Sequence, residues 1–190
     1  IIFAPLTIWK KDMSKRNNFI WNAIQTICWL IFAGYSIQTG ALLFNLIYSL
    51  FNPVATHNLH LGLDLSQLYS NSQLVYVFVF VLIIVISALK AFVFFIVLKL
   101  FKKLNLIKPF SENVSSIISK ITYYAFAIGI ISIISQQLIQ RLIQKGFNVG
   151  VVERYWDDGG VYLMMSAILF VIALIFQKGI ELQNENDLTV

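Results

Sequence analysis

Four long apolar stretches constrain this chain more than any other feature. Apolar residues run from Phe19 to about Phe51, from Leu74 to Leu98, from about Ile117 to Ile139, and from Val161 to Phe176. A helix needs roughly 20 such residues to cross the hydrocarbon core of a bilayer, and backbone polar groups cannot be left without partners there. Only 12% of the residues are charged, whereas a soluble domain is about 25% charged. The sequence therefore predicts an all-α integral membrane protein, an antiparallel bundle of four transmembrane helices.

The span boundaries follow from the same stretches. We predict spans at about 19–45, 74–98, 117–139 and 161–177, within a membrane domain covering 19–178. Residues 1–18 are predicted to be a cytoplasmic segment, in which Met13 resembles a natural start and 1–12 are candidates for non-native sequence. Residues 179–190 are predicted to be a polar cytoplasmic tail. The first stretch exceeds one crossing, so we expect a tilted helix that continues past the outer surface or a break near Gly40.

Basic residues indicate the orientation. Four Lys or Arg residues precede the first span, five lie in or beside the connection between the second and third spans, and three lie between the third and fourth. Because cytoplasmic loops carry the excess of Lys and Arg, both termini are predicted to face the cytoplasm in a bacterial inner membrane. The net charge of +5 is explained by this topology, so we expect the lipid bilayer as a partner and no direct contact with nucleic acid.

Lys90 is the main candidate for a functional residue, because it lies inside the second apolar stretch. It precedes Lys99 by nine residues, about 13 Å of helix, which predicts a position near the bilayer midplane. All nine acidic residues lie outside the apolar stretches, so we expect hydrogen bonds from Lys90 to Gln25 and Ser132. Lys90 would then be a site for an anionic ligand or a proton-linked switch. The alternatives are a snorkelling lysine or an inner membrane boundary closer to Lys90.

Two connections contain weaker candidates. His57, His60 and Asp64 could share one face of a helix and bind a divalent metal or titrate as a pH sensor, but we favour a solvated loop without metal or other cofactor. The connection Gly146–Gly160 is soluble in character. Its Tyr155 and Trp156 are predicted to be anchors at the membrane interface, with a ligand-binding lid as the alternative.

Other signals concern association and catalysis. Gly129, with Ala125 and Ala127, could line a close helix contact in a homo-oligomer.

The sequence contains no H-E-x-x-H, G-x-S-x-G or G-x-x-x-x-G-K-[ST] motif, each of which would place a known catalytic or phosphate-binding group. A membrane enzyme is therefore the least supported class of function, and the expected function is not enzymatic.

Three short motifs resemble those of a known family. They are Gly62-Leu63-Asp64-Leu65, Lys108-Pro109-Phe110-Ser111, and the terminal Glu185-Asn186-Asp187-Leu188-Thr189-Val190. In this order they resemble the bacterial membrane proteins named domain of unknown function 2975. The resemblance implies a four-helix inner-membrane protein without established activity. Members of this family are often encoded beside small helix-turn-helix regulators of the Cro/CI type, an association that suggests such a regulator as a partner.

Two hypotheses about function remain. The first is a non-enzymatic regulatory or sensing protein that binds a cytoplasmic partner through the inner connection and tail, with Pro109, Phe110, Ser111, Glu185 and Asp187 as docking candidates. Here Pro109 ends one helix, and Ser111 caps the next with Glu112 in its first turn. The alternative is a small transporter or immunity-type membrane protein that uses Lys90.

Overall fold

The computed structural model describes residues 6–104, 110–156 and 158–187, and four long helices dominate it. They are α1 (Leu6–Phe51), α3 (Gln73–Lys103), α4 (Glu112–Gln144) and α5 (Gly159–Asp187). Each is long and apolar enough to cross a membrane. The protein is therefore an all-α, multi-pass membrane protein with four transmembrane helices, as predicted. The short elements are η1 (Pro53–His57), η2 (His60–Gly62), α2 (Ser66–Asn71) and η3 (Gly150–Tyr155).

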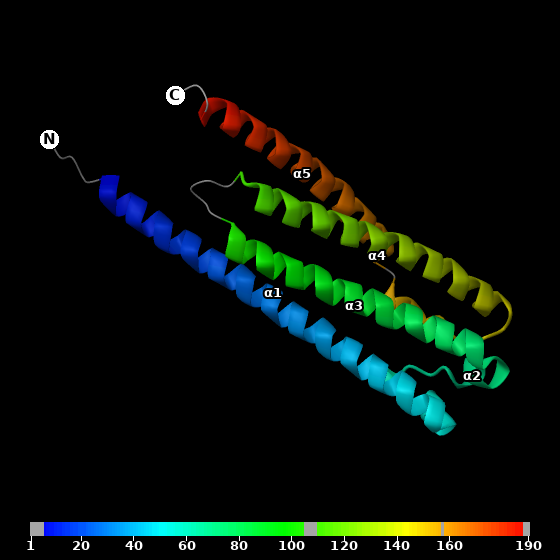
Figure 1. The fold of residues 1–190 in the computed structure, drawn as a ribbon. Coiled ribbons are helices and arrows are strands. Elements are labelled where there is room, and N and C mark those ends of the chain that lie inside the picture. Colours follow the sequence, from blue (N-terminus) through cyan, green and yellow to red (C-terminus); the bar gives the residue numbers. More distant parts are fainter. Residues whose placement is uncertain (1–5, 105–109, 157, 188–190) are drawn as a thin grey trace.

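The long helices pack in chain order. Helix α1 packs against α3, α3 against α4, and α4 against α5. Figure 1 shows that the start of α1, the end of α3, the start of α4 and the end of α5 all lie at one end of the bundle. We call this the inner end, because the predicted orientation places it in the cytoplasm, and the opposite end is the outer end.

The helices extend beyond the predicted spans. Helix α1 continues through Gly40 without a break, which agrees with the first of the two expectations for this stretch. Helix α5 continues to Asp187, so most of the predicted tail is helical. Ser111 accepts a hydrogen bond from the Val114 backbone N–H at 3.4 Å, with Glu112 in the first turn of α4, which confirms the predicted cap.

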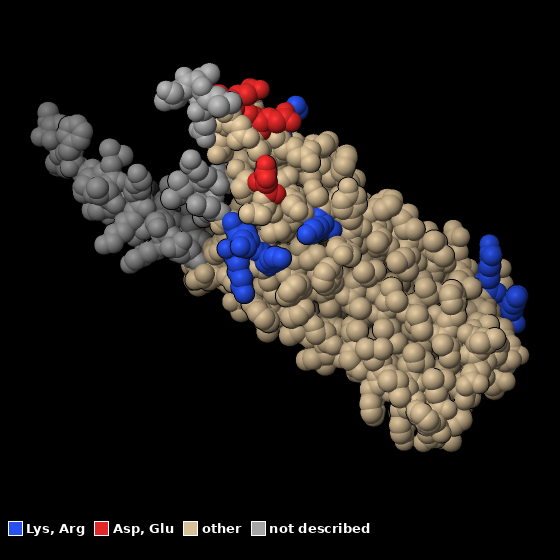
Figure 2. Space-filling view, in the orientation of Figure 1, with Lys and Arg blue, Asp and Glu red and all other residues tan. Residues whose placement is uncertain are grey.

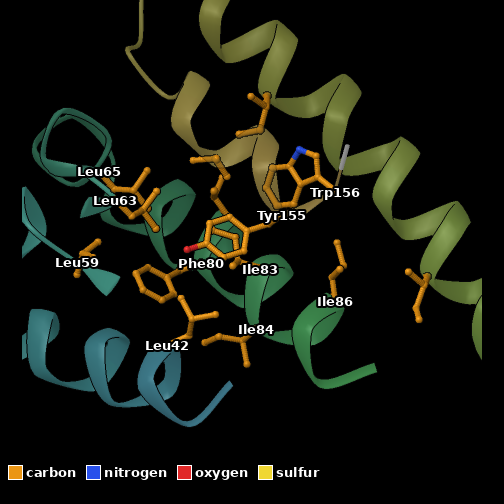
Figure 3. Packing of buried hydrophobic residues seen from close by; sticks show 14 of the residues in the cluster. Leu42, Leu59, Leu63, Leu65, Phe80, Ile83, Ile84, Ile86, Tyr155 and Trp156 are labelled. Atoms are coloured by element: carbon orange, nitrogen blue, oxygen red, sulfur yellow. The ribbon is translucent and has the colours of Figure 1, made fainter. Parts of the chain in front are cut away.

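The connections at the outer end form a packed core with the helices. Leu42 of α1, Phe80 of α3, Leu63 and Leu65 of the first connection, and Trp156 of the last connection are all buried. Figure 3 shows side chains from these segments converging between the helices. The prediction of a soluble connection between the third and fourth spans is wrong here. Its apolar side chains pack inside the protein, since Trp156 is only 1% exposed.

Helix α5 begins halfway along α4 rather than at its end (Figure 1). A Cβ atom on Gly159, the first residue of α5, would lie 2.8 Å from the Cβ of Ser132 and 3.4 Å from the backbone oxygen of Gly129. Gly129 follows the start of α4 by 17 residues and precedes its end by 15, so about 22 Å of α4 lie beyond it. Residues 145–156 and 158 therefore fold back into the bundle, and we call them the fold-back segment.

The small residues of α4 serve this internal packing. A Cβ on Gly129 would lie 2.6 Å from a methyl carbon of Leu163 in α5, and Ala125 is fully buried. The predicted close helix contact at Gly129 is confirmed, with α5 of the same chain as the neighbouring helix, and the homo-oligomer stays a prediction. The two small residues allow α4 and α5 to approach closely within one chain.

Charged side chains gather toward the ends of the bundle. Figure 2 shows Lys and Arg at both ends of one face, Asp and Glu near the inner end, and uncharged residues over the broad middle. This distribution matches a chain whose middle lies in hydrocarbon.

Candidate functional site at a buried ion pair

Lys90 forms an ion pair with Asp158 in the middle of the bundle. Its Nζ donates to the two carboxylate oxygens of Asp158 at 2.7 and 2.9 Å and to the backbone oxygen of Tyr155 at 3.1 Å. Lys90 is 5% exposed, and it follows the start of α3 by 17 residues and precedes its end by 13. This depth is far from either helix end, so the ammonium depends on these partners.

Two aromatic rings flank the ammonium. The Nζ of Lys90 lies 6.0 Å from the ring centroid of Tyr35 in α1 and 5.5 Å from that of Tyr162 in α5. Electron-rich ring faces at such distances attract a cation. The site therefore combines α1, α3 and the start of α5 around one charge.

The fold-back segment places the carboxylate. Asp158 directly precedes α5, and its backbone oxygen accepts from the Tyr162 N–H at 3.1 Å. A carboxylate at a helix N-terminus also interacts favourably with the unpaired N–H groups there. The expectation that no acid lies at the depth of Lys90 is wrong, because it treated the connection as a surface loop. Its acidic residue is instead carried inward.

Neither of the two predicted partners is among the groups to which Lys90 donates. Gln25 precedes Tyr35 by ten residues of continuous helix, about 15 Å along the axis, so it is at another depth. Ser132 lies near the site, against Gly159, but its hydroxyl oxygen has no hydrogen-bond partner among the described residues.

Four buried polar atoms near the fold-back segment share this property. Within the described part of the chain, no hydrogen-bond partner is found for the hydroxyls of Ser132, Ser135 and Tyr155 or for the indole Nε1 of Trp156. Figure 3 shows the Trp156 indole lying between the fold-back segment and α4. A buried donor without a partner costs about 1–3 kcal/mol. The packing of apolar side chains around the segment, including Val149 and Val152, therefore has to hold these polar atoms in the core.

The burial of the two aromatic rings also corrects their predicted role. Tyr155 and Trp156 are at most 4% exposed, so their side chains pack in the protein core and do not anchor it at the lipid interface. Helix α5 begins at Gly159, two residues before the predicted span, and the residue at position 157 lies outside the described residues.

The histidine cluster does not form the predicted helical face. His57 is in η1 and His60 in η2, and Leu61 has a φ of +58°, which interrupts any helix. The Nδ1 of His57 lies 3.9 Å from an Asp64 carboxylate oxygen, and both side chains are exposed. In the described ranges, no group of three or more His, Cys, Asp or Glu residues is placed to hold a metal ion.

Phe110 connects the inner end of α4 to α5. Its ring lies 5.3 Å from that of Phe176, at 60°, and a Cβ on Gly179 would lie 2.5 Å from it. Among the other docking candidates, Ser111 caps α4, Glu185 is exposed on α5, and Asp187 ends α5. Pro109 lies outside the described residues. Their role in docking stays a prediction.

The sequence profile of one family matches this chain. The family is described as "Protein of unknown function (DUF2975)", and the match covers residues 60–190, which include both members of the ion pair, Phe110 and all of α5. No curated protein and no solved structure matches the chain.

Proposed function

We propose that this chain, which belongs to the DUF2975 family of proteins of unknown function, is a non-enzymatic sensing or regulatory protein of the bacterial inner membrane. It would pass a signal from the outer half of the bundle to a cytoplasmic partner. The observation that carries this proposal is the Lys90–Asp158 ion pair at the start of α5, because α5 leads without interruption to the inner end.

A buried ion pair is suited to a switch. Its net contribution to stability is small, because desolvation of both charges offsets their attraction, whereas loss of one partner is costly. Lys90 and Asp158 lie on separate elements, and the buried donors of the fold-back segment have no partners among the described residues. A modest change at Asp158 could therefore shift the segment between two arrangements.

Helix α5 is suited to carry that shift inward. It has 29 residues, about 44 Å of helix, and it meets Phe110 at Gly179. A displacement at Gly159 would thus move the surface around Phe110 and the acidic end of α5, which includes Glu181 and Glu185. A cytoplasmic partner would contact these two elements together.

The orientation and partner are part of the proposal. The basic residues in and beside the connection between α3 and α4 support a cytoplasmic inner end. The resemblance noted from the sequence motifs supports a small helix-turn-helix regulator as the partner, with no direct contact between this chain and nucleic acid. The transport or immunity alternative is less supported, because the Lys90 ammonium is enclosed and bound to Asp158.

The coupling is tested by labelling in a Cys28→Ser background, since Cys28 is the only cysteine. We expect Lys90→Met to change the maleimide labelling rate of Gln183→Cys on α5 at least threefold. Labelling of Lys102→Cys at the end of α3 should stay unchanged, which makes it the matched control. Equal rates at Gln183→Cys with and without Lys90→Met would show that α5 does not report on the pair.

The partner is tested separately by co-purification of the full chain with a small helix-turn-helix regulator of the Cro/CI type. Deletion of Glu181–Val190 and the variant Phe110→Ala should each reduce recovery of the regulator at least fivefold. Unchanged recovery in both variants would contradict docking at this surface.

A further inference from the structure

A cavity of about 480 Å³ lies beside the ion pair, between α3, α4 and α5. Its apolar wall includes Val93 and Leu100 of α3, Ile121 of α4, and Met165 and Leu169 of α5. The volume is within the range of small-molecule sites, which are mostly apolar with a few placed polar groups. All these wall residues lie on the inner side of the pair.

The cavity is elongated along the bundle axis. Its α3 wall extends from Val93 to Leu100 and its α5 wall from Val161 to Leu169, about 10–12 Å of each helix. This shape fits an extended alkyl chain better than a compact or branched molecule.

Asp158 provides the polar end of the cavity. It lines the cavity together with Tyr162, and its side chain is 39% exposed whereas that of Lys90 is 6% exposed. The cavity therefore presents a hydrogen-bond acceptor and not a cation. An ionised carboxylate can accept about four hydrogen bonds, of which Lys90 takes two.

The charge of the pair restricts the head group of a ligand. Lys90 already neutralises Asp158, so an additional charge in this apolar cavity would be desolvated without a counter-ion. An uncharged hydroxyl can donate to a free acceptor position of Asp158 without that cost. We propose that the cavity binds a single-chain amphiphile with an uncharged hydroxyl head group, with the chain lying between α3 and α5.

The lining residues set the direction of a bound chain. Those of α3 all follow Lys90 and those of α5 all follow Asp158, so the cavity extends from the ion pair toward the inner end. A bound molecule would therefore place its head group at Asp158 and its chain inward.

This inference deepens the proposed function, because a hydroxyl that shares Asp158 would weaken its bond to Lys90 and so act as the signal. Binding is tested on the full chain in phosphatidylcholine nanodiscs, with a photoreactive decan-1-ol as the probe and no partner present. We expect saturable cross-linking to peptides containing residues 93–100 and 161–169. Decanoate should compete at least tenfold less well than decan-1-ol.

Two neighbouring methionines provide matched variants. Met165→Trp would fill the cavity, and we expect it to reduce cross-linking at least tenfold. Met164→Trp changes a side chain that is 65% exposed and should leave cross-linking unchanged. Circular dichroism of both variants verifies their folding.

Three results would overturn the inference: labelling that does not saturate, equal labelling of the two variants, or equal competition by decanoate. If binding is confirmed while Gln183→Cys labelling is insensitive to Lys90→Met, the cavity is a binding site and the proposed signalling role fails.

Discussion

At the scale of single residues, the two members of the ion pair are not equivalent. Lys90 is almost completely enclosed, whereas the Asp158 side chain is 39% exposed. An unpaired charge is costly in proportion to its burial, so the cost of losing a partner depends on which residue remains. Loss of the Asp158 carboxylate is more costly than loss of the Lys90 ammonium. Of the acceptors that Lys90 contacts, it would then retain only the Tyr155 carbonyl.

We therefore predict that Asp158→Asn destabilises the protein more than Lys90→Met. Removing one partner of a fully buried pair costs about 3–5 kcal/mol, and we expect Asp158→Asn to fall in this range and Lys90→Met at about 1–3 kcal/mol. The double variant should be more stable than Asp158→Asn alone. The free energy of unfolding in mixed micelles is measured for all three variants. If the effects of the two substitutions add in the double variant, the two side chains do not interact.

The environment of Asp64 leads us to expect that the stability of the protein decreases at acidic pH. Partial burial raises its pKa, but hydrogen bonds from the Ser66 backbone N–H and hydroxyl, together with nearby His57, lower the pKa below its ordinary value of 3.8. A lowered pKa in the folded state means that the carboxylate stabilises the fold above pH 4, and that this contribution is lost as pH falls through the folded pKa. Asp64→Asn should thus cost at most about 1 kcal/mol of folding free energy at pH 7, the scale of exposed charged pairs, and less at pH 2. Equal costs at both pH values, by thermal unfolding, would contradict this assignment.

At the scale of elements, the four helices could be predicted from the sequence and the fold-back segment could not. Long apolar stretches in lipid leave the backbone only one solution, and Ser111 with Glu112 is a local capping signal. The conformation of the fold-back segment depends on tertiary contacts. Its charged residues Glu153, Arg154 and Asp158 indicated a solvent-exposed loop. One signal was present: Val149, Val152 and Trp156 recur at helical spacing, and all three are buried.

The contact between α4 and α5 depends on the absence of a side chain at Gly159. A Cβ there would lie 2.8 Å from that of Ser132, whereas a Cβ on the adjacent Gly160 would meet no atom within 4 Å. We predict that Gly159→Ala lowers the free energy of unfolding by about 1–3 kcal/mol, the usual cost of overpacking, and that Gly160→Ala leaves it unchanged or slightly higher. Comparison of the two variants in mixed micelles separates packing from helix propensity, and equal effects would argue against close contact at Gly159.

At the scale of the whole molecule, the bundle is asymmetric along its axis. The outer half contains α1, α3 and α4, the connections that precede α3 and α5, and most of the large core, whereas the inner half contains all four long helices with α1 and α5 at its margins (Figure 1). The Lys90–Asp158 pair lies where these halves meet. In the proposed function, an event in the outer half would reach the inner end through α5, and this route depends on the start of α5 lying at the middle of α4.

A disulfide between Ser132→Cys and Gly159→Cys in the Cys28→Ser background tests that position most directly. Disulfides join Cβ atoms about 3.8 Å apart, so a small outward shift of Gly159 from its present contact would allow the bond. The structure predicts rapid cross-linking on mild oxidation in native membranes, and little for Ser132→Cys with Gly160→Cys. Absence of the first cross-link in a folded protein, or equal formation of both, would contradict the fold-back of this segment and with it the pairing of Asp158 with Lys90.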